Sequence, residues 1–381
     1  MKHKILMTNN TLDFRSGTEL YLRDVALSLQ KRGHLPVAYS TRLGQVAEDL
    51  RQAGVTVTDD LQTIPFVPDI IHGQHHLETL CALMHFARTP AVFFCHGTVP
   101  WEETPPCFPR IYRYVAVDEN SARRVLDETK TGPDRVSVIS NFVDLTRFRP
   151  RGPLPERPRK AALFSSTIQR DRIPLIQQAC RRRRVDLELL GMVSGKVCRH
   201  PEQKLIQYDL VLAKGRAALE SLAVGASVLL CDYSALGPMV SSGNLDRLRR
   251  FNLGLSCLDR PLTVANLVAE IDRYDAQDTA QVSARIRSEA GCEAVVDRIL
   301  QVYQLALEDH GRATPDPNAE LQESSSYLKW LGAALQERER QSRRLLDELD
   351  QLNRTFTIRL RNRILNLPLL GRGIRRLLMG G

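Results

Sequence analysis

The stretch that decides the fold runs from Tyr208 to Asp232 and reads YDLVLAKGRAALESLAVGASVLLCD. Residues 209–213 are a short apolar run, typical of a buried strand. A helical pattern follows and stops at Gly225, and a second apolar run, 227–232, comes directly after it. A strand, a helix and a strand in this order are typical of a βαβ unit in a parallel sheet.

Lys214, Gly215 and Arg216 stand where the first strand of this unit ends and its helix begins. Two cations and a glycine at a helix N-terminus suit a diphosphate, because the helix dipole, the free amides and both side chains favour negative charge. Glu220 lies one turn further along and can accept hydrogen bonds from ribose hydroxyls. The alternative is an ordinary surface ion pair between Arg216 and Glu220 at i,i+4 spacing.

The same alternation of strands and helices extends over both sides of this unit. It predicts an N-terminal Rossmann-like lobe over 1–148, a proline-rich solvated linker over 149–160 and a second Rossmann-like lobe over 161–310. The fold class is therefore α/β with two lobes. Parallel sheets bind ligands at the carboxyl ends of their strands, so a cleft is expected where those two edges face each other.

A second candidate site opens the first helix of the N-terminal lobe. The segment RSGTEL, Arg15 to Leu20, follows the first strand directly. A glycine there lets a ligand approach the backbone amides of the first helical turn. The plainer interpretation is a helix cap, which serine and threonine before a helix usually provide.

These segments together resemble one family. ALESLAVGASVLLCD, VSVISNFVDLTRFRP (Val136–Pro150), SGTELYLRDVALSLQKRGH and FFCHGT are similar to four segments of the retaining glycosyltransferase family 4 with the GT-B fold, and they stand in the family's order along the chain. The resemblance covers roughly residues 3–300. It implies a nucleotide-diphosphate sugar as donor, retention of anomeric configuration, and no metal or other cofactor.

The resemblance also implies roles for single residues. Glu220 would hold the donor ribose, and Gly17 with Thr18 would face the diphosphate. His96, at the end of a strand, would lie near the transferred sugar, and Asn141 would lie at the hinge. Lys214, Arg216 and the helix dipole are expected to neutralise the departing diphosphate and, with His96, form the predicted catalytic set. Three histidines at the end of the third expected strand can line the acceptor side (His72, His75, His76).

The sequence departs from the family at two places. The family's first glutamate falls eight residues before the second, and here that position is Leu212, inside the strand. The basic residues after the first strand of the second lobe are displaced. Ser165, Ser166, Arg170 and Arg172 stand there instead, and Ser165 is the one expected in the donor site.

The net charge of +9 belongs mostly to the end of the chain. Residues 351–381 hold seven arginines and no acid, and subtracting them leaves +2 for the rest. The basic amphipathic segment 358–381 suits an anionic membrane surface. Nucleic acid is not expected as a partner, because the segment from 351 on has Phe356 as its one aromatic residue for stacking.

Between the lobes and this tail, a helical segment is expected over 320–357. Its leucines follow a 3-4 spacing from Leu328 to Leu352, interrupted by Arg338 and Ser342. The spacing predicts a short coiled coil over 328–356, through which two chains can pair. A helix packed on its own body is the alternative.

The eight cysteines lack metal-ligand spacing, no run of the sequence is long and apolar enough to span a membrane, and the first residues do not form a signal peptide. A cytoplasmic protein, peripheral at the inner face of the membrane, is therefore expected. The sequence predicts a glycosyltransferase acting on a surface-glycan or lipid-linked acceptor. A non-catalytic assembly protein that binds nucleotide sugars and a sugar-nucleotide epimerase remain the alternatives.

Overall fold

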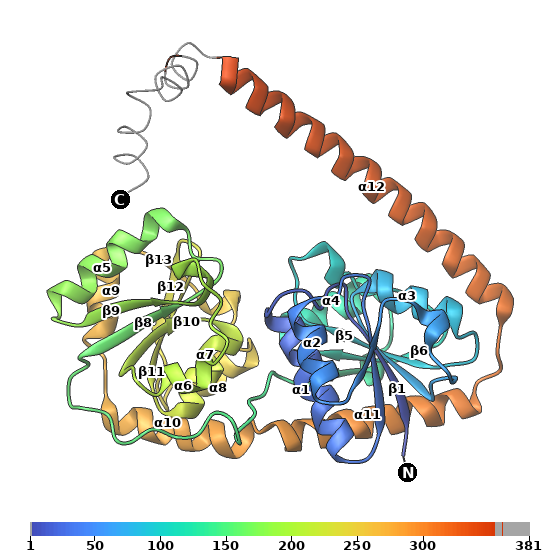
Figure 1. The fold of residues 1–381 in the computed structure, drawn as a ribbon, viewed down its shortest axis with the longest axis horizontal. Helices are drawn as coiled ribbons and strands as arrows, with labels where there is room; N and C mark the ends of the chain where they lie inside the picture. The colour runs from blue at the N-terminus through green and yellow to red at the C-terminus, as the bar shows by residue number, and fades with distance from the viewer. Residues whose placement is uncertain (1, 355–359, 361–381) are drawn as a thin grey trace. The chain divides into compact units, whose positions relative to one another are not determined.

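The structure is a computed structural model, and it describes residues 2–354 and 360. It forms two compact units, residues 1–315 and 316–381. The first unit contains two β-sheets, each covered by helices (Figure 1). The expected α/β class with two Rossmann-like lobes is confirmed.

The first sheet has seven parallel strands in the order β3-β2-β1-β4-β5-β6-β7. Its strand order reverses beside β1, as in Rossmann folds, which places a ligand site at the carboxyl end of that strand. The strands are β1 (Lys4–Thr8), β2 (Leu35–Tyr39), β3 (Thr56–Thr58), β4 (Ile70–Gln74), β5 (Ala91–Cys95), β6 (Ile111–Ala116) and β7 (Val136–Val138). The helices between them are α1 (Gly17–Lys31), α2 (Gln45–Gln52), α3 (His76–His85) and α4 (Glu119–Thr129).

The second sheet has six strands in the order β13-β12-β11-β10-β8-β9. Four strands are parallel, and β12 and β13 add an antiparallel edge. The strands are β8 (Lys160–Phe164), β9 (Asp186–Leu190), β10 (Leu210–Ala213), β11 (Ser227–Asp232), β12 (Ala235–Met239) and β13 (Arg260–Pro261). The helices are α5 (Ile173–Arg182), α6 (Pro201–Leu205), α7 (Gly215–Val224), α8 (Leu245–Arg250), α9 (Val264–Ile271) and α10 (Ala276–Glu289).

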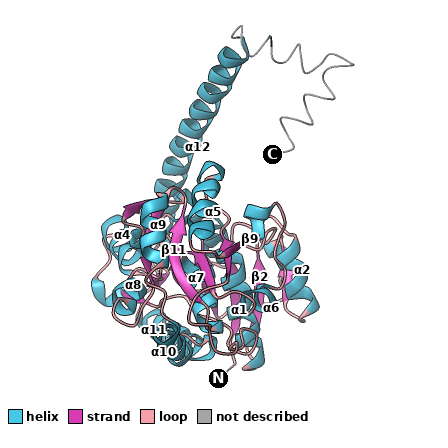
Figure 2. Ribbon diagram, turned by 90° about the vertical axis from the view of Figure 1, so that its left-hand side faces the viewer, coloured by secondary structure: helices cyan, strands magenta, loops and turns pink. Residues whose placement is uncertain are grey.

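Successive residues of the second sheet point into two different cores. Leu210 and Leu212 of β10 pack with α5 and α9, whereas Val211 and Ala213 pack with α7, α8 and α10. A central strand buried on both faces is continuously apolar, which is why the run before Lys214 has no polar alternation. Figure 2 shows strands with helices on either side.

Helix α11 (Cys292–Arg312) packs on the first sheet rather than the second. Val295, Val296 and Ile299 share a core with α1, and the Tyr303 hydroxyl is 2.5 Å from Nδ1 of His72 on β4. Residues 292–310, expected in the second lobe, therefore contribute their apolar face to the first. The reason is that helical periodicity shows that a face is buried but not which sheet buries it.

The linker is anchored to the second lobe at a few points, although its residues are exposed or half-buried. The Arg151 guanidinium pairs with Asp209 at 2.9 Å, and its backbone amide donates to the Val224 carbonyl. The Asp209 carboxylate also accepts the amides of Arg159 and Lys160. These bonds fix the chain as it enters β8.

The second unit contains α12 (Pro317–Arg354), one continuous helix in which no side chain is buried. It includes residues 320–354 of the segment expected to be helical. Among the described helices, none is long and apolar enough to cross a bilayer. The basic tail expected at 358–381 falls outside the described residues except for position 360.

Candidate donor site between the two sheets

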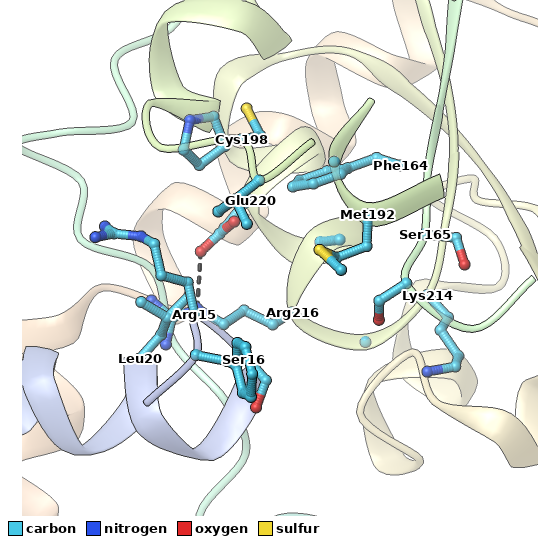
Figure 3. A pocket seen from close by; sticks show the side chains of 18 of the residues that line it. Arg15, Ser16, Leu20, Phe164, Ser165, Met192, Cys198, Lys214, Arg216 and Glu220 are labelled. Atoms are coloured by element: carbon cyan, nitrogen blue, oxygen red, sulfur yellow. Dashed lines mark hydrogen bonds and ion pairs between the residues drawn. The ribbon is translucent and has the colours of Figure 1, made fainter. Parts of the chain in front are cut away.

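A pocket of about 320 Å³ opens between the two lobes at the carboxyl ends of both sheets. From the first lobe it is lined by the start of α1 and the residues before it, including Arg15, Ser16 and Leu20 (Figure 3). From the second lobe it is lined by the end of β8, the turn after β9, the start of α7 and the end of β11. The cleft therefore lies where the two-lobe pattern predicted it.

Most of the residues predicted for the donor site line this pocket. They are Gly17, Ser165, Lys214, Gly215, Arg216 and Glu220. Thr18 and His96 lie outside the set of lining residues. The Thr18 hydroxyl is 3.1 Å from the Glu19 carboxylate, so it points along α1.

Arg216 is the most enclosed of the predicted cations. Its Nε donates to Glu220 at 2.8 Å, and its Nη2 pairs with Asp24 on α1, across the two lobes. Burial acts to lower the pKa of Arg216, but the charges of Asp24 and Glu220 outweigh it and raise the pKa. The predicted i,i+4 pair is present, but it is part of a buried network rather than a surface pair.

Glu220 is 5% exposed, although it lines the pocket. Burial raises its pKa, and the charge and hydrogen bond of Arg216 offset this only in part. One carboxylate oxygen accepts from Arg216, and a carboxylate has further lone pairs for a ligand. The position of Glu220 is thus fixed by Arg216 before any ligand binds.

Lys214 is held by an acid that sequence analysis did not single out. Its Nζ lies 3.0 Å from Asp232, which is 2% exposed at the end of β11, and 5.6 Å from the centre of the Tyr233 ring. Asp232 also accepts the hydroxyls of Ser165 and Thr167, each at 2.6 Å. The Ser165 hydroxyl therefore donates its hydrogen bond to Asp232, and its Oγ accepts hydrogen bonds from the backbone amides of Thr167 and Ile168.

The start of α7 has an unusual backbone. Gly215 has φ +56°, in the left-handed region that glycine tolerates best, and a Cβ there would meet open space. Its amide donates to the Leu253 carbonyl at 2.7 Å. The first-turn amides of Arg216 and Ala217, both lining the pocket, have no acceptor within the helix.

The start of α1 is not closed by a side-chain cap. Ser16 precedes Gly17 with extended backbone, but its hydroxyl contacts the Glu19 side chain rather than an amide of the first turn. No atom lies within 4 Å of a Cβ placed on Gly17. The capping alternative for RSGTEL therefore fails for the serine, and the glycine leaves open space beside the helix start.

Three arginines that line the pocket were not predicted as site residues, although all of them lie in segments quoted above: Arg15, Arg23 and Arg147. Arg15 pairs with Asp49 on α2, and Arg147 pairs with Glu202 on α6 at 3.1 Å. Their acidic partners are 34 and 55 residues away in the chain, so no local pattern could have revealed the pairs.

His96 lies in a buried polar cluster of the first lobe. Its ring contacts Tyr21 edge-on, with 4.5 Å between centroids, and its buried Nε2 has no hydrogen-bond partner among the described residues. Burial lowers its pKa to about 4, so the imidazole is neutral near pH 7. Its backbone amide donates to the Glu103 carboxylate at 2.8 Å.

The other predicted histidines belong to the same region. His72 stacks on Phe94 with 3.6 Å between centroids. His75 has φ +62°, receives the Asn10 amide at Nδ1, and lies with Nε2 3.5 Å from Glu103. His76 packs edge-on against Trp101, with 4.4 Å between centroids. Their role in the acceptor site stays a prediction.

Asn141 lies where the two lobes meet. Its amide donates to the Asn252 side chain at 3.1 Å, and its carbonyl accepts from Arg249 at 3.2 Å. Burial lowers the pKa of Arg249 to about 10. These contacts join the segment after β7 to α8 and the loop after it, and the hinge role of Asn141 stays a prediction.

Sequence comparison places one part of the chain in a known family. Residues 65–147 match the family model of Glycosyltransferase Family 4. No curated protein matches the chain.

Comparison of folds extends over most of the chain. A glycosyltransferase from Rickettsia africae has a TM-score of 0.58 and 14% identity, covering 80% of this chain and 99% of its own. Anabaena HepE, in complex with UDP and glucose, has a TM-score of 0.57 and 16% identity, covering 79% and 99%. A putative UDP-N-acetylglucosamine 2-epimerase from Listeria monocytogenes has a TM-score of 0.52 and 14% identity, and the match covers 81% of this chain and 97% of the epimerase. The expected resemblance is confirmed: residues 65–147 match the family 4 model, and the chain has the GT-B fold of known glycosyltransferases.

Proposed function

We propose that the chain is a glycosyltransferase that moves a sugar from a nucleotide-diphosphate sugar to a surface-glycan or lipid-linked acceptor. One observation carries the proposal: five cationic side chains and two carboxylates line a pocket between the lobes of a glycosyltransferase fold. The cations are Arg15, Arg23, Arg147, Lys214 and Arg216, and the acids are Glu220 and Asp232. The cationic side chains that face the cavity suit an anionic ligand of diphosphate size, even though each of them is already paired with an acid.

The groups at the start of α7 are suited to bind the diphosphate of the donor. Lys214 and the amides of Arg216 and Ala217 can bind its oxygens, and the helix dipole favours the same charge. The open space beside Gly17 lets the phosphates approach the start of α1 as well. When the sugar leaves, the same groups stabilise the negative charge that develops on the diphosphate.

Glu220 is the proposed acceptor for the ribose hydroxyls. Its carboxylate lines the pocket while Arg216 fixes its orientation at 2.8 Å, so little side-chain freedom is lost on binding. The apolar wall formed by Phe164, Met192 and Val197 suits the flat face of a nucleotide base. HepE, which shares the fold, was solved with UDP and with UDP-glucose.

We also propose that transfer retains the anomeric configuration and needs no metal. Retaining transfer in this fold depends on stabilising the leaving group more than on a strong base, and Lys214 and Arg216 supply that charge. His96 is proposed to contact the transferred sugar as a neutral imidazole, consistent with its lowered pKa. The tail at 358–381 is proposed to bind the anionic inner face of the plasma membrane from the cytoplasm, close to a lipid-linked acceptor.

Two other functions share this pocket. An epimerase acting on the nucleotide sugar is favoured by the shared fold of the Listeria protein. A non-catalytic nucleotide-sugar-binding protein is favoured by Leu212, which is fully buried in β10 at the place of the family's first glutamate.

The test is a titration of the full chain with uridine-, guanosine- and thymidine-diphosphate sugars, read by thermal shift and by release of free nucleotide. Glu220→Gln should weaken donor binding roughly tenfold to a hundredfold, because it removes a charge-assisted hydrogen bond. Glu188→Gln, on β9 and bonded to Tyr208, is the matched control and should bind like the unchanged chain.

The products separate the three functions. Slow hydrolysis of the donor to free sugar and nucleoside diphosphate without acceptor supports a transferase. A new nucleotide sugar formed without acceptor would indicate an epimerase. Binding with neither product, even with lipid-linked acceptors, would indicate the non-catalytic protein, and no binding to any donor would overturn all three.

A further inference from the structure

We infer that α12 pairs with α12 of a second copy of the chain in an antiparallel coiled coil. The helix is 38 residues long and has no buried side chain. Leu328, Leu335, Leu345, Leu349 and Leu352 are each more than half exposed. An isolated helix gains little stability in water, and a stripe of exposed leucines along it requires a partner.

All leucines of α12 except Leu346, which is at position e, stand on one heptad register. Taking Leu328 as position a, the d and a positions that follow are 331, 335, 338, 342, 345, 349 and 352. Six of these eight core positions are leucine, and the two exceptions, Arg338 and Ser342, are adjacent in the middle. This is the 3-4 spacing of a two-stranded coiled coil rather than the wider stripe of a helix that covers a globular body.

The pattern is also symmetric about its own centre. Reversing the helix exchanges position 328 with 352, 331 with 349, and 335 with 345, and each exchange replaces leucine by leucine. Arg338 exchanges with Ser342. A surface that matches its own reverse is the property of an isologous interface, in which the same patch serves both copies. The second copy is therefore the partner that this face fits.

The two polar residues at the centre of the heptad pattern determine whether the paired helices are parallel or antiparallel. In a parallel pair, Arg338 would face Arg338 of the second copy in the seam, and the two positive charges would repel each other. In an antiparallel pair, each Arg338 faces Ser342 of the second copy, and every leucine layer is kept. The acidic side chains near the centre lie outside the a/d seam: Glu337 is at position c, and Glu339, at position e beside the seam, pairs with Arg343 at 2.5 Å.

The experiment places opposite charges at positions 335 and 345, which meet only in the antiparallel pair. The full chain should be a dimer by light scattering, and Leu335→Glu and Leu345→Lys should each weaken dimerisation by about tenfold or more, because each leaves a charge against leucine. The variant that combines both substitutions should recover much of the loss, since the introduced carboxylate of one copy then faces the introduced ammonium of the other. Ala333→Glu, on the outer face of the helix, is the control and should remain a dimer.

Each other outcome overturns the inference. A monomeric unchanged chain at tens of micromolar means that no second copy covers the stripe. A double variant that dissociates more readily than both single variants means that the helices are parallel, because like charges then face each other. A trimer or larger assembly would exclude the two-helix pair. These outcomes are independent of sugar transfer, because none of the substituted residues lines the pocket.

Discussion

Asp24 on α1 and Arg216 on α7 form an ion pair that joins the two lobes, and Arg216 lines the pocket between them. Arg23 and Arg147 lie against the same carboxylate, at 2.7 and 3.7 Å. Burial acts to raise the pKa of Asp24, but Arg216 and Arg23 outweigh it and hold the pKa below its ordinary value. A single acid of the first lobe thus positions a cation that lines the pocket from the second lobe.

Asp24→Asn should lower the free energy of unfolding by about 2–4 kcal/mol, because it leaves Arg216 buried with Glu220 as its remaining counter-charge. Urea unfolding of the full chain measures the loss. Asp297→Asn is the control, since Asp297 pairs with Arg32 but is 62% exposed, and it should cost less than about 1 kcal/mol. Equal losses in the two variants would contradict a special role for the pair between the lobes.

Lys214 and Asp232 can be separated by a double-mutant cycle. Lys214→Met should weaken donor binding about tenfold to a hundredfold and destabilise the fold by about 1–3 kcal/mol, because buried Asp232 loses its cation. Adding Asp232→Asn should restore much of the stability but none of the donor binding. Donor titration and urea unfolding of all four proteins measure the cycle, and recovery of donor binding in the double variant would show that Lys214 does not bind the diphosphate.

The two glycines of the pocket should respond differently to alanine. Gly17→Ala should leave stability unchanged or raise it by up to about 0.5 kcal/mol, because Gly17 is the first residue of α1 and a Cβ there meets no atom. It should still weaken donor binding if the phosphates approach the backbone.

Gly215→Ala should destabilise the fold by about 1–2 kcal/mol, because alanine is strained at φ +56°. Thermal unfolding with and without donor measures both effects. A stable Gly17→Ala variant with unchanged donor affinity would remove Gly17 from the site.

The pair of His75 and Glu103 predicts a pH dependence of stability. Burial acts to lower the pKa of His75, but its hydrogen bond and charge interaction with Glu103 outweigh this and raise the pKa above the ordinary 6.5. Burial likewise acts to raise the pKa of Glu103, and the two histidines outweigh it and lower the pKa below 4.5. His75 therefore contributes stability that is complete below pH 6.5 and is lost as the pH rises through its folded pKa. Glu103 contributes stability that is complete above pH 4.5 and is lost as the pH falls through its folded pKa.

Glu103→Gln should therefore lower the free energy of unfolding most between pH 4.5 and 6.5, by about 2–4 kcal/mol, and less at lower or higher pH. Urea unfolding of both proteins from about pH 4 to about pH 9 gives the difference. Glu188→Gln serves again as the control, with no maximum in this range expected. If the loss of unfolding free energy in Glu103→Gln does not vary with pH, His75 and Glu103 are not charged at the same time.

The sequence by itself determined the βαβ pattern of both lobes and the position of the main candidate site. Local apolar runs and helical periodicity predicted β10, α7 and β11, because the apolar pattern within each segment shows which of its faces are buried. The same pattern placed Lys214, Gly215 and Arg216 at the carboxyl edge of a sheet. It missed β3 and the β12–β13 edge, since these strands are short or irregular and have weak apolar alternation.

Only the tertiary structure decided which charges meet. Arg216 lies 192 residues from Asp24 along the chain, and Ser165 lies 67 residues from Asp232. Helix α11 has the same periodicity whichever sheet it covers, and the fold assigns it to the first. An ion pair or a helix–sheet contact depends on two surfaces that meet only after folding, whereas a strand or helix depends mainly on neighbours within a few residues. The sequence therefore predicted the candidate site at α7, and the fold supplied the acids that hold its cations in place.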